Sequence, residues 1–255
     1  MVGDAVERVL ALGAAGEGEL AKLAAPLAEE QKHRGLYLAL RGERGSMHLV
    51  MTGLGEGRFS LTDPIFDLGG TMIWREKLAG WQLRQQLRRE HPEMLEIVNR
   101  AVAAAALPVH EQAGPLEAIE REVKEHKARG TNLTIPVLLP SVASTGERFR
   151  QSQALIRTLG AAVAAERYRL ARGDWPARLD DLVPAQLAAV PLDPFDGLPL
   201  RYARRPDGVA VYSVGLDGRD DGGTIDRKAP RGRGPDVGYE LWEAKRRGQA
   251  ANGKK

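Results

Sequence analysis

The sequence predicts an α+β protein: a helical N-terminal region, then one long helix and a small antiparallel sheet. Alanine, the strongest helix former, is used heavily. Apolar residues recur at helical spacing through much of the first two thirds of the chain. Two short apolar segments near the C-terminal end flank a Pro-Asp-Gly turn, which indicates a hairpin. We therefore expect a helical region over 1–140, a mixed module over 141–240 and a basic tail over 241–255.

Glycine and proline divide the helical region. Residues 17–35 place Leu20, Leu23 and Leu27 on one helical face. Residues 114–129 form another amphipathic helix, which ends at Gly130. Between them, we expect the helical pattern to break at His91-Pro92, because proline lacks the N–H group that a helix interior needs.

Residues 36–54 fit two structures. Their two apolar runs around Arg-Gly-Glu-Arg-Gly resemble a hairpin. The apolar side chains also share one helical face, and we favour the helix; they are Leu36, Leu40, Met47, Met51 and Leu54.

The C-terminal module begins with a long helix over about residues 146–172, which Gly173 ends. Its expected buried side consists of Leu155, Leu159, Val163 and Leu170. Asp174 and Pro176 are then expected to begin a short helix. Residues 198–205 and 208–214 form the two strands of the hairpin.

Composition and motifs exclude several functions. The chain has no cysteine, so disulfides, thiolate zinc sites and a cysteine nucleophile are excluded. The five histidines lack the spacing of a zinc motif, and no serine-hydrolase elbow or P-loop occurs. We expect no enzymatic activity.

Charge and hydropathy limit the partners. The net charge is +3, and removing the five basic residues of the tail leaves −2, so specific binding to nucleic acid is not expected. No run of about 18 apolar residues occurs, and the first residues lack the basic leader of a signal peptide. Membrane attachment would need an anchor that this chain does not contain.

Carboxylates are crowded directly after the second strand. Asp217, Asp220, Asp221 and Asp226 lie within ten residues, interleaved with glycine. Such a run is either a solvated turn or a group of carboxylates that needs a cation. Its spacing does not fit an EF-hand, since Arg219 stands at the third ligand position. Arg219, Arg227 and Lys228 also lie near enough in sequence to pair with the acids.

Four short signatures resemble one family when taken together. They are "ERYRLARGDWPARLDDLV", "VPLDPFDG", "LPLRYAR" and "DGVAVYSVGLDGRDDGG", and they follow the order of the globular module of type II secretion major pseudopilins. The remainder of the chain resembles envelope proteins of planctomycete type, in which a helical region precedes this module. The resemblance implies that the long helix packs on a two- to three-stranded antiparallel sheet. Tyr168, Trp175 and Phe195 are expected to pack where the helix meets the sheet.

In that family the loop after the second strand resembles a calcium site. Carried over to this sequence, the resemblance implies Asp217 as a side-chain ligand. Further carboxylates would come from Asp220, Asp221, Asp226 or Asp236, and carbonyl groups from residues such as Ser213 and Val214. Calcium would hold the sheet and the helix together.

The chain departs from pseudopilins at its start. They begin with a basic leader, a cleavage glycine and a long apolar helix, none of which occurs here. We therefore expect the module to serve as a scaffold and not to polymerise into a fibre. The resemblance implies an extracytoplasmic envelope protein that binds structural calcium and has a protein partner, and we expect it to be non-catalytic. The alternative is a metal-free interaction module related to a secretion apparatus.

Overall fold

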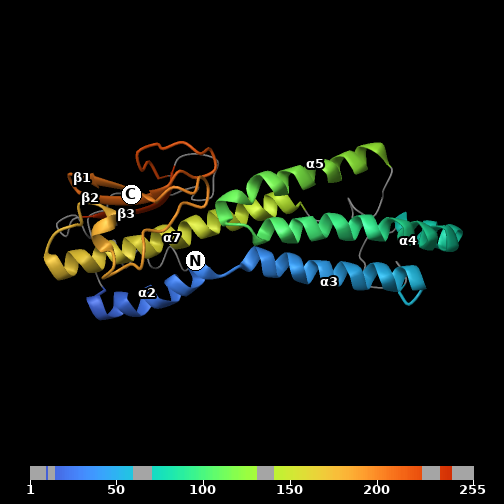
Figure 1. The fold of residues 1–255 in the computed structure, drawn as a ribbon, viewed down its shortest axis with the longest axis horizontal. Helices are drawn as coiled ribbons and strands as arrows, with labels where there is room; N and C mark the ends of the chain where they lie inside the picture. Colours follow the sequence, from blue (N-terminus) through green and yellow to red (C-terminus); the bar gives the residue numbers. More distant parts are fainter. Residues whose placement is uncertain (1–9, 11–14, 60–70, 131–140, 226–235, 243–255) are drawn as a thin grey trace, which may run out of the picture. The chain divides into compact units, whose positions relative to one another are not determined.

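The computed structural model describes residues 10, 15–59, 71–130, 141–225 and 236–242. Over these ranges the chain forms five α-helices followed by a three-stranded antiparallel sheet, which confirms the α+β class (Figure 1). Two compact units result: Arg34–Gly146, and Met1–His33 together with Glu147–Lys255. None of the helices in the described ranges is both long and apolar enough to span a bilayer.

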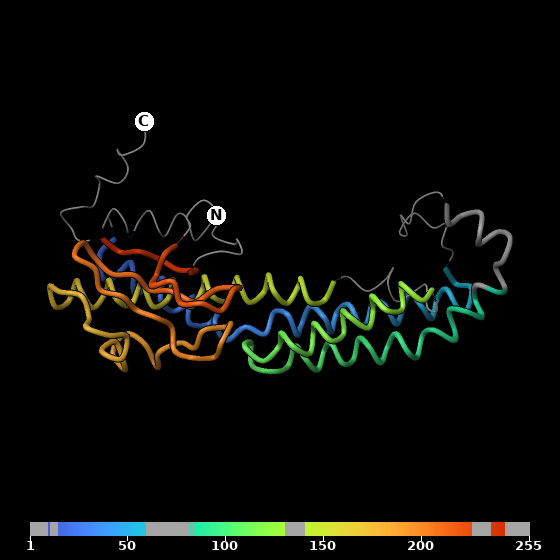
Figure 2. The backbone as a smooth tube through the Cα atoms, turned by 90° about the horizontal axis from the view of Figure 1, so that it is seen from above, coloured from blue at the N-terminus to red at the C-terminus, as the bar shows by residue number. Residues whose placement is uncertain are grey.

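The unit Arg34–Gly146 is built from α3 (Gly35–Glu56), α4 (Thr71–Ala106) and α5 (Ala113–Arg129). Arg34 at the start of α3 donates to the Ala106 carbonyl at the end of α4, at 3.1 Å. Arg88 of α4 donates to the Gly55 carbonyl near the end of α3, at 3.0 Å. The two helices are therefore antiparallel neighbours, as Figures 1 and 2 show.

The ambiguous residues 36–54 are helical, and they form most of α3. Their apolar stripe is buried, with Leu36, Leu40, Met47, Met51 and Leu54 each 6% exposed or less. Arg41-Gly42-Glu43-Arg44-Gly45 continues this helix instead of forming a turn. The helix forms here and not the hairpin, because the helical periodicity of the apolar residues gives α3 one continuous face to bury.

The expected break at His91-Pro92 is wrong, since α4 runs through Pro92 without interruption. Proline removes one backbone hydrogen bond from the helix interior. Leu87, Met94 and Val98, on both sides of Pro92, are each at most 4% exposed. Because these residues continue one buried face across the proline, the packing of the whole helix outweighs the local loss.

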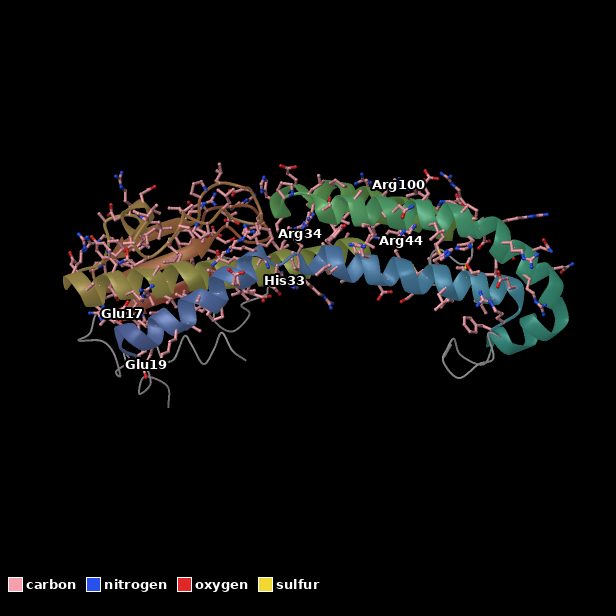
Figure 3. The ribbon with its side chains drawn as sticks, turned by 60° about the horizontal axis from the view of Figure 1, so that its bottom comes forward. Glu17, Glu19, His33, Arg34, Arg44 and Arg100 are labelled. Carbon is pink, nitrogen blue, oxygen red and sulfur yellow. The ribbon has the colours of Figure 1, made fainter. Side chains whose placement is uncertain are left out.

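The second unit contains α2 (Glu17–Lys32) and, from Glu147 on, α7 (Val142–Arg172), which begins four residues earlier than expected. The carboxylate of Glu17 accepts two hydrogen bonds from the Arg167 guanidinium, at 2.7 and 3.0 Å. Figure 3 labels Glu17 and Glu19 in the first turn of α2. A Cβ at Gly160 of α7 would lie 2.5 Å from the amide nitrogen of the Gln31 side chain, so the end of this side chain lies against Gly160.

The sheet has the order β1 (Arg201–Arg205), β2 (Gly208–Ser213), β3 (Val237–Trp242). β1 and β2 form the expected hairpin, with Arg205 opposite Gly208 across the turn. β2 also pairs with β3, from Gly208 with Trp242 to Ser213 with Val237. Gly208 has φ 150°, and a Cβ there would lie 1.9 Å from the Leu241 carbonyl oxygen, so only glycine fits.

The long helix packs on the sheet through one apolar core. Its buried members include Leu159 and Ala161–Ala165 of α7, Val209 and Val211 of β2, and Tyr239 and Leu241 of β3. Trp175 is buried in this core and Tyr168 packs against it, as predicted. Two expectations are wrong: Leu170 is 40% exposed, and Phe195 is only half-buried and lies outside the core.

The segment after α7 differs from the short helix expected at Asp174 and Pro176. Gly173 ends α7 with φ 82°, as predicted. The next helical turn, η2 (Leu179–Leu182), is a 3₁₀ helix that starts only at Leu179. Asp174 instead accepts hydrogen bonds from the backbone N–H of Trp175 and from the Arg204 guanidinium. Trp175, directly after Asp174, is buried in the core.

Candidate functional site

The acidic loop, defined here as residues 214–225, continues from the end of β2. Asp236, directly before β3, lies beside it, because the backbone N–H of Gly223 donates to Asp236 Oδ2 at 2.7 Å. Gly223 has φ 79°, and a Cβ there would lie 3.0 Å from both the Tyr212 ring and the Arg205 guanidinium. Glycine thus lets the loop fold back onto the sheet and meet Asp236.

Asp236 is a buried carboxylate with one unsatisfied oxygen. The residue is 2% exposed, and its Oδ1 has no hydrogen-bond donor within the described ranges. Burial raises the pKa of Asp236, and the charges of Asp220 and Asp221 raise it further, while the N–H groups of Gly223 and Asp221 act in the opposite direction. The carboxylate is therefore destabilised in its charged form. No other carboxylate in the described ranges has a buried oxygen without a donor.

Asp220 and Asp221 lie on the exposed part of the acidic loop. Asp220 Oδ1 accepts hydrogen bonds from the Gly222 N–H and from the Tyr212 hydroxyl, each at 3.0 Å. Burial of the phenol, together with this carboxylate, raises the pKa of Tyr212 to about 12. The carbonyl of Asp221 accepts a hydrogen bond from the Thr224 hydroxyl at 2.8 Å. The loop therefore brings two negative side chains close to the buried Asp236.

Asp217, the ligand that the resemblance implies first, occupies an exposed turn. Its Oδ1 accepts the backbone N–H of Arg219 at 3.0 Å, which is a local turn contact. Asp226 lies outside the described residues, as do Arg227 and Lys228. Of the carboxylates expected at the site, the structure therefore relates Asp220 and Asp221 to Asp236.

Ser213 and Val214 are buried and bound to a carboxylate that the sequence did not single out. The Ser213 hydroxyl donates to Asp193 Oδ1 at 2.8 Å, and the Val214 N–H donates to Asp193 Oδ2 at 2.9 Å. Asp193 is fully buried and also accepts bonds from the Phe195 N–H and the Arg201 guanidinium. Asp193 belongs to the Asp-Pro-Phe-Asp-Gly turn, which the sequence does show. Its partner Ser213 lies 20 residues further along the chain, so the sequence does not show their contact.

Arg201 lies between two carboxylates, those of Asp193 and Asp196. The Asp196 contact raises the pKa of Arg201, although burial of the guanidinium acts in the opposite direction. Burial alone would raise the pKa of Asp196, but the hydrogen bonds from Arg201 and Leu198 lower it overall. Every oxygen of Asp193 has donors, so this cluster fixes the start of the acidic loop and offers no open ligand position.

Arg205 of β1 is a cation that contacts the backbone of the acidic loop. Its Nη2 donates to the carbonyls of Gly222 and Gly223 at 3.2 and 2.7 Å, and its Nη1 pairs with Glu240 of β3. The sequence suggested other cations because they are closer along the chain. Arg205 is the last residue of β1. Because β1 pairs with β2 in the hairpin, Arg205 can reach the acidic loop, which follows β2 in the chain.

Within the part of the chain that the structure describes, no three His, Asp or Glu side chains are grouped as metal ligands. A cation at Asp236 would therefore need backbone carbonyls in its shell, and calcium accepts such ligands readily. The site offers oxygen atoms only, which fits a hard cation and does not fit zinc or copper.

Comparison of the chain with protein-family models, with curated proteins and with solved structures finds no match in any of the three.

Proposed function

We propose that residues 141–242 form a non-catalytic, pseudopilin-like module of the cell envelope, in which the acidic loop binds a structural calcium ion at Asp236. One observation carries this proposal. Asp236 Oδ1 is buried and none of the residues that the structure describes donates to it, while Asp220 and Asp221 add negative charge to the same place. Asp217, Asp226 and the carbonyls of Ser213 and Val214 complete the set of candidate ligands.

The charges around Asp236 affect the free energy of the folded loop. A buried, incompletely paired carboxylate costs several kcal/mol unless it is protonated or receives a partner. The neighbouring carboxylates add to this cost, as the raised pKa of Asp236 indicates. A divalent cation replaces the missing donor and offsets the repulsion at the same time. The folded state would therefore be more stable with the ion than without it.

The proposed location follows from the family resemblance and from mass action. An ion that binds only the folded state stabilises it in proportion to the logarithm of its concentration above the dissociation constant. Compartments outside the cytoplasm supply such concentrations of calcium. We propose an extracytoplasmic location and a protein partner in the envelope.

The test measures calcium binding by the full chain in two ways: calorimetric titration, and thermal melts with calcium or with chelator. Wild type should bind calcium and gain melting temperature. Asp236→Asn should lose both responses, and should melt higher than wild type in chelator, because the amide removes a buried charge. Asp180→Asn, an exposed acid outside the acidic loop, is the matched control and should respond like wild type.

An equal calcium response of wild type and Asp236→Asn would remove Asp236 from the site. Asp217→Asn then distinguishes the remaining possibility, because loss of the response in this variant alone would move the ion to the outer turn. No calcium response in wild type would overturn the proposed metal function.

The second candidate is a metal-free interaction module, and the contacts of Arg205 favour it. Its guanidinium already binds two carbonyls of the acidic loop. Under this alternative, Asp236→Asn still raises the melting temperature in chelator, but calcium leaves wild type unchanged. Arg205→Gln would then destabilise the protein equally with and without calcium.

A further inference from the structure

Two histidines from different helices meet in the unit Arg34–Gly146. Nδ1 of His48, on α3, lies 3.1 Å from Nε2 of His91, on α4. The ring centroids are 5.1 Å apart and the ring planes differ by 32°. The two residues are 43 positions apart in sequence, so no local motif predicts that they are in contact. The antiparallel pairing of α3 and α4 brings them together.

Contacts on both sides hold this pair in place. Arg44, one turn before His48, donates to the Asn99 side chain of α4 at 2.5 Å; Figure 3 labels Arg44 on α3. On the other side, Arg88 of α4 donates to the Gly55 carbonyl of α3. Met51 of α3 and Met94 of α4, each three residues after one of the two histidines, are at most 1% exposed. The contacts between α3 and α4 therefore set the backbone positions from which the two imidazoles extend.

The separation of the two nitrogens is that of ligands on one metal ion. Two zinc–nitrogen bonds of about 2.05 Å place their nitrogens about 3.3 Å apart at a tetrahedral angle and about 2.9 Å apart at a right angle. The observed 3.1 Å lies between these values. We propose that His48 and His91 form a two-histidine site for a borderline divalent transition ion such as Zn²⁺.

Metal binding requires a change of tautomer in one ring. In the observed contact one of the facing nitrogens carries the hydrogen that the other accepts. When an ion binds both facing nitrogens, that ring carries its proton on its other nitrogen, so no net proton is gained or lost. Imidazole nitrogen selects zinc, copper or nickel and disfavours calcium, so this site differs in chemistry from the acidic loop.

The site is open to solvent on one side. His48 is exposed, and the described residues supply no third His, Asp or Glu ligand. Water therefore fills the remaining coordination positions, as it does in zinc sites with incomplete protein shells. Arg44 and Arg88 add positive charge about one helical turn away, so the affinity comes from the two coordinate bonds. The ion would join α3 to α4 across their interface.

The experiment titrates the full chain with Zn²⁺ in excess calcium, so that the carboxylates of the acidic loop are occupied by the harder ion. Wild type should bind one zinc equivalent, and His48→Gln and His91→Gln should each weaken this binding at least about tenfold. His110→Gln, which removes a histidine of η1 (Val109–Glu111), keeps the histidine count equal and should bind like wild type.

A second readout needs no variant. The ring signals of His48 and His91 in wild type should shift together at one zinc equivalent in nuclear magnetic resonance spectra, while those of His110 stay unchanged. Absence of zinc binding in wild type would overturn the proposal, as would equal binding by all three variants or a shift confined to other histidines. Because the titration concerns zinc in excess calcium, its outcome is separate from that of the calcium test.

Discussion

At the scale of single residues, buried carboxylates organise the C-terminal unit. Asp193 has donors on both oxygens, whereas one oxygen of Asp236 has no donor among the described residues. The two therefore have opposite consequences for stability. The first stabilises the junction between β2 and the acidic loop, and the second is the place where a ligand would have an effect.

The first prediction concerns Asp193. Asp193→Ala should lower the free energy of unfolding by about 3–5 kcal/mol, because Arg201 and three neutral donors lose a buried partner. Asp196→Ala removes the more exposed partner of the same guanidinium and should cost clearly less. Urea denaturation of both variants measures the difference. A larger loss for Asp196→Ala would mean that Arg201 depends mainly on the outer carboxylate.

The second prediction compares adjacent glycines of the acidic loop. Gly222 and Gly223 both have positive φ, 68° and 79°, so alanine should cost about 1–2 kcal/mol at either position from backbone strain. A Cβ at Gly222 meets no atom within 4 Å, whereas at Gly223 it presses on Tyr212 and Arg205. Gly223→Ala should therefore be less stable than Gly222→Ala by a further ~1–3 kcal/mol. Equal melting temperatures of the two variants would show that the loop does not rest on the sheet as described.

At the scale of elements, a side chain of one helix caps the start of another. The first turn of α7 is capped from another helix: Glu120 of α5 accepts the Ser141 hydroxyl and the Ala143 N–H. A carboxylate at a helix start also complements the helix dipole. This cap joins two elements that the sequence predicts separately.

The third prediction is the pH dependence of that cap. The Ser141 hydrogen bond lowers the pKa of Glu120; burial acts against it, and Lys124 and the Ala143 N–H lower the pKa further. Because the folded pKa lies below the ordinary value of 4.5, the stabilisation is present above about pH 4.5 and disappears as pH falls through the folded pKa. Glu120→Gln should therefore lose stability at pH 7 and lose less than wild type on acidification.

Thermal melts between pH 3 and pH 7 measure this effect. Glu117→Gln, which changes an exposed carboxylate on the same helix, is the control and should follow the wild-type profile. A wild-type profile for Glu120→Gln as well would exclude the proposed cap.

The sequence predicts elements where one pattern spans the whole element. The apolar stripes of α3 and the end of α7 at Gly173 belong to this class. Pro92 and Asp174 show the limit of local rules. Each has a strong local preference, for a helix break and for a helix start, yet packing on both sides of Pro92 and the contacts of Asp174 with β1 override it.

At the scale of the whole molecule, the two units should respond to different ligands. The fourth prediction is that calcium increases hydrogen-exchange protection of 208–225 and 236–242 in the full chain, and leaves 84–106 of α4 unchanged. Zinc should increase protection around His48 and His91 and leave the acidic loop unchanged. Hydrogen exchange followed by mass spectrometry separates these segments. A calcium response spread over both units would contradict separate sites.

The sequence by itself determined the α+β class, the helical stripes, the β1–β2 hairpin and the crowding of acids after β2. These depend on periodicity and turn chemistry, which act between residues that are near in the chain. Only the tertiary structure decided that β3 completes the sheet, that Asp193 holds Ser213, that Asp236 is buried beside the acidic loop, and that His48 meets His91. Burial and contacts between distant residues are properties of the packed chain. A local sequence pattern therefore does not predict which carboxylate is buried.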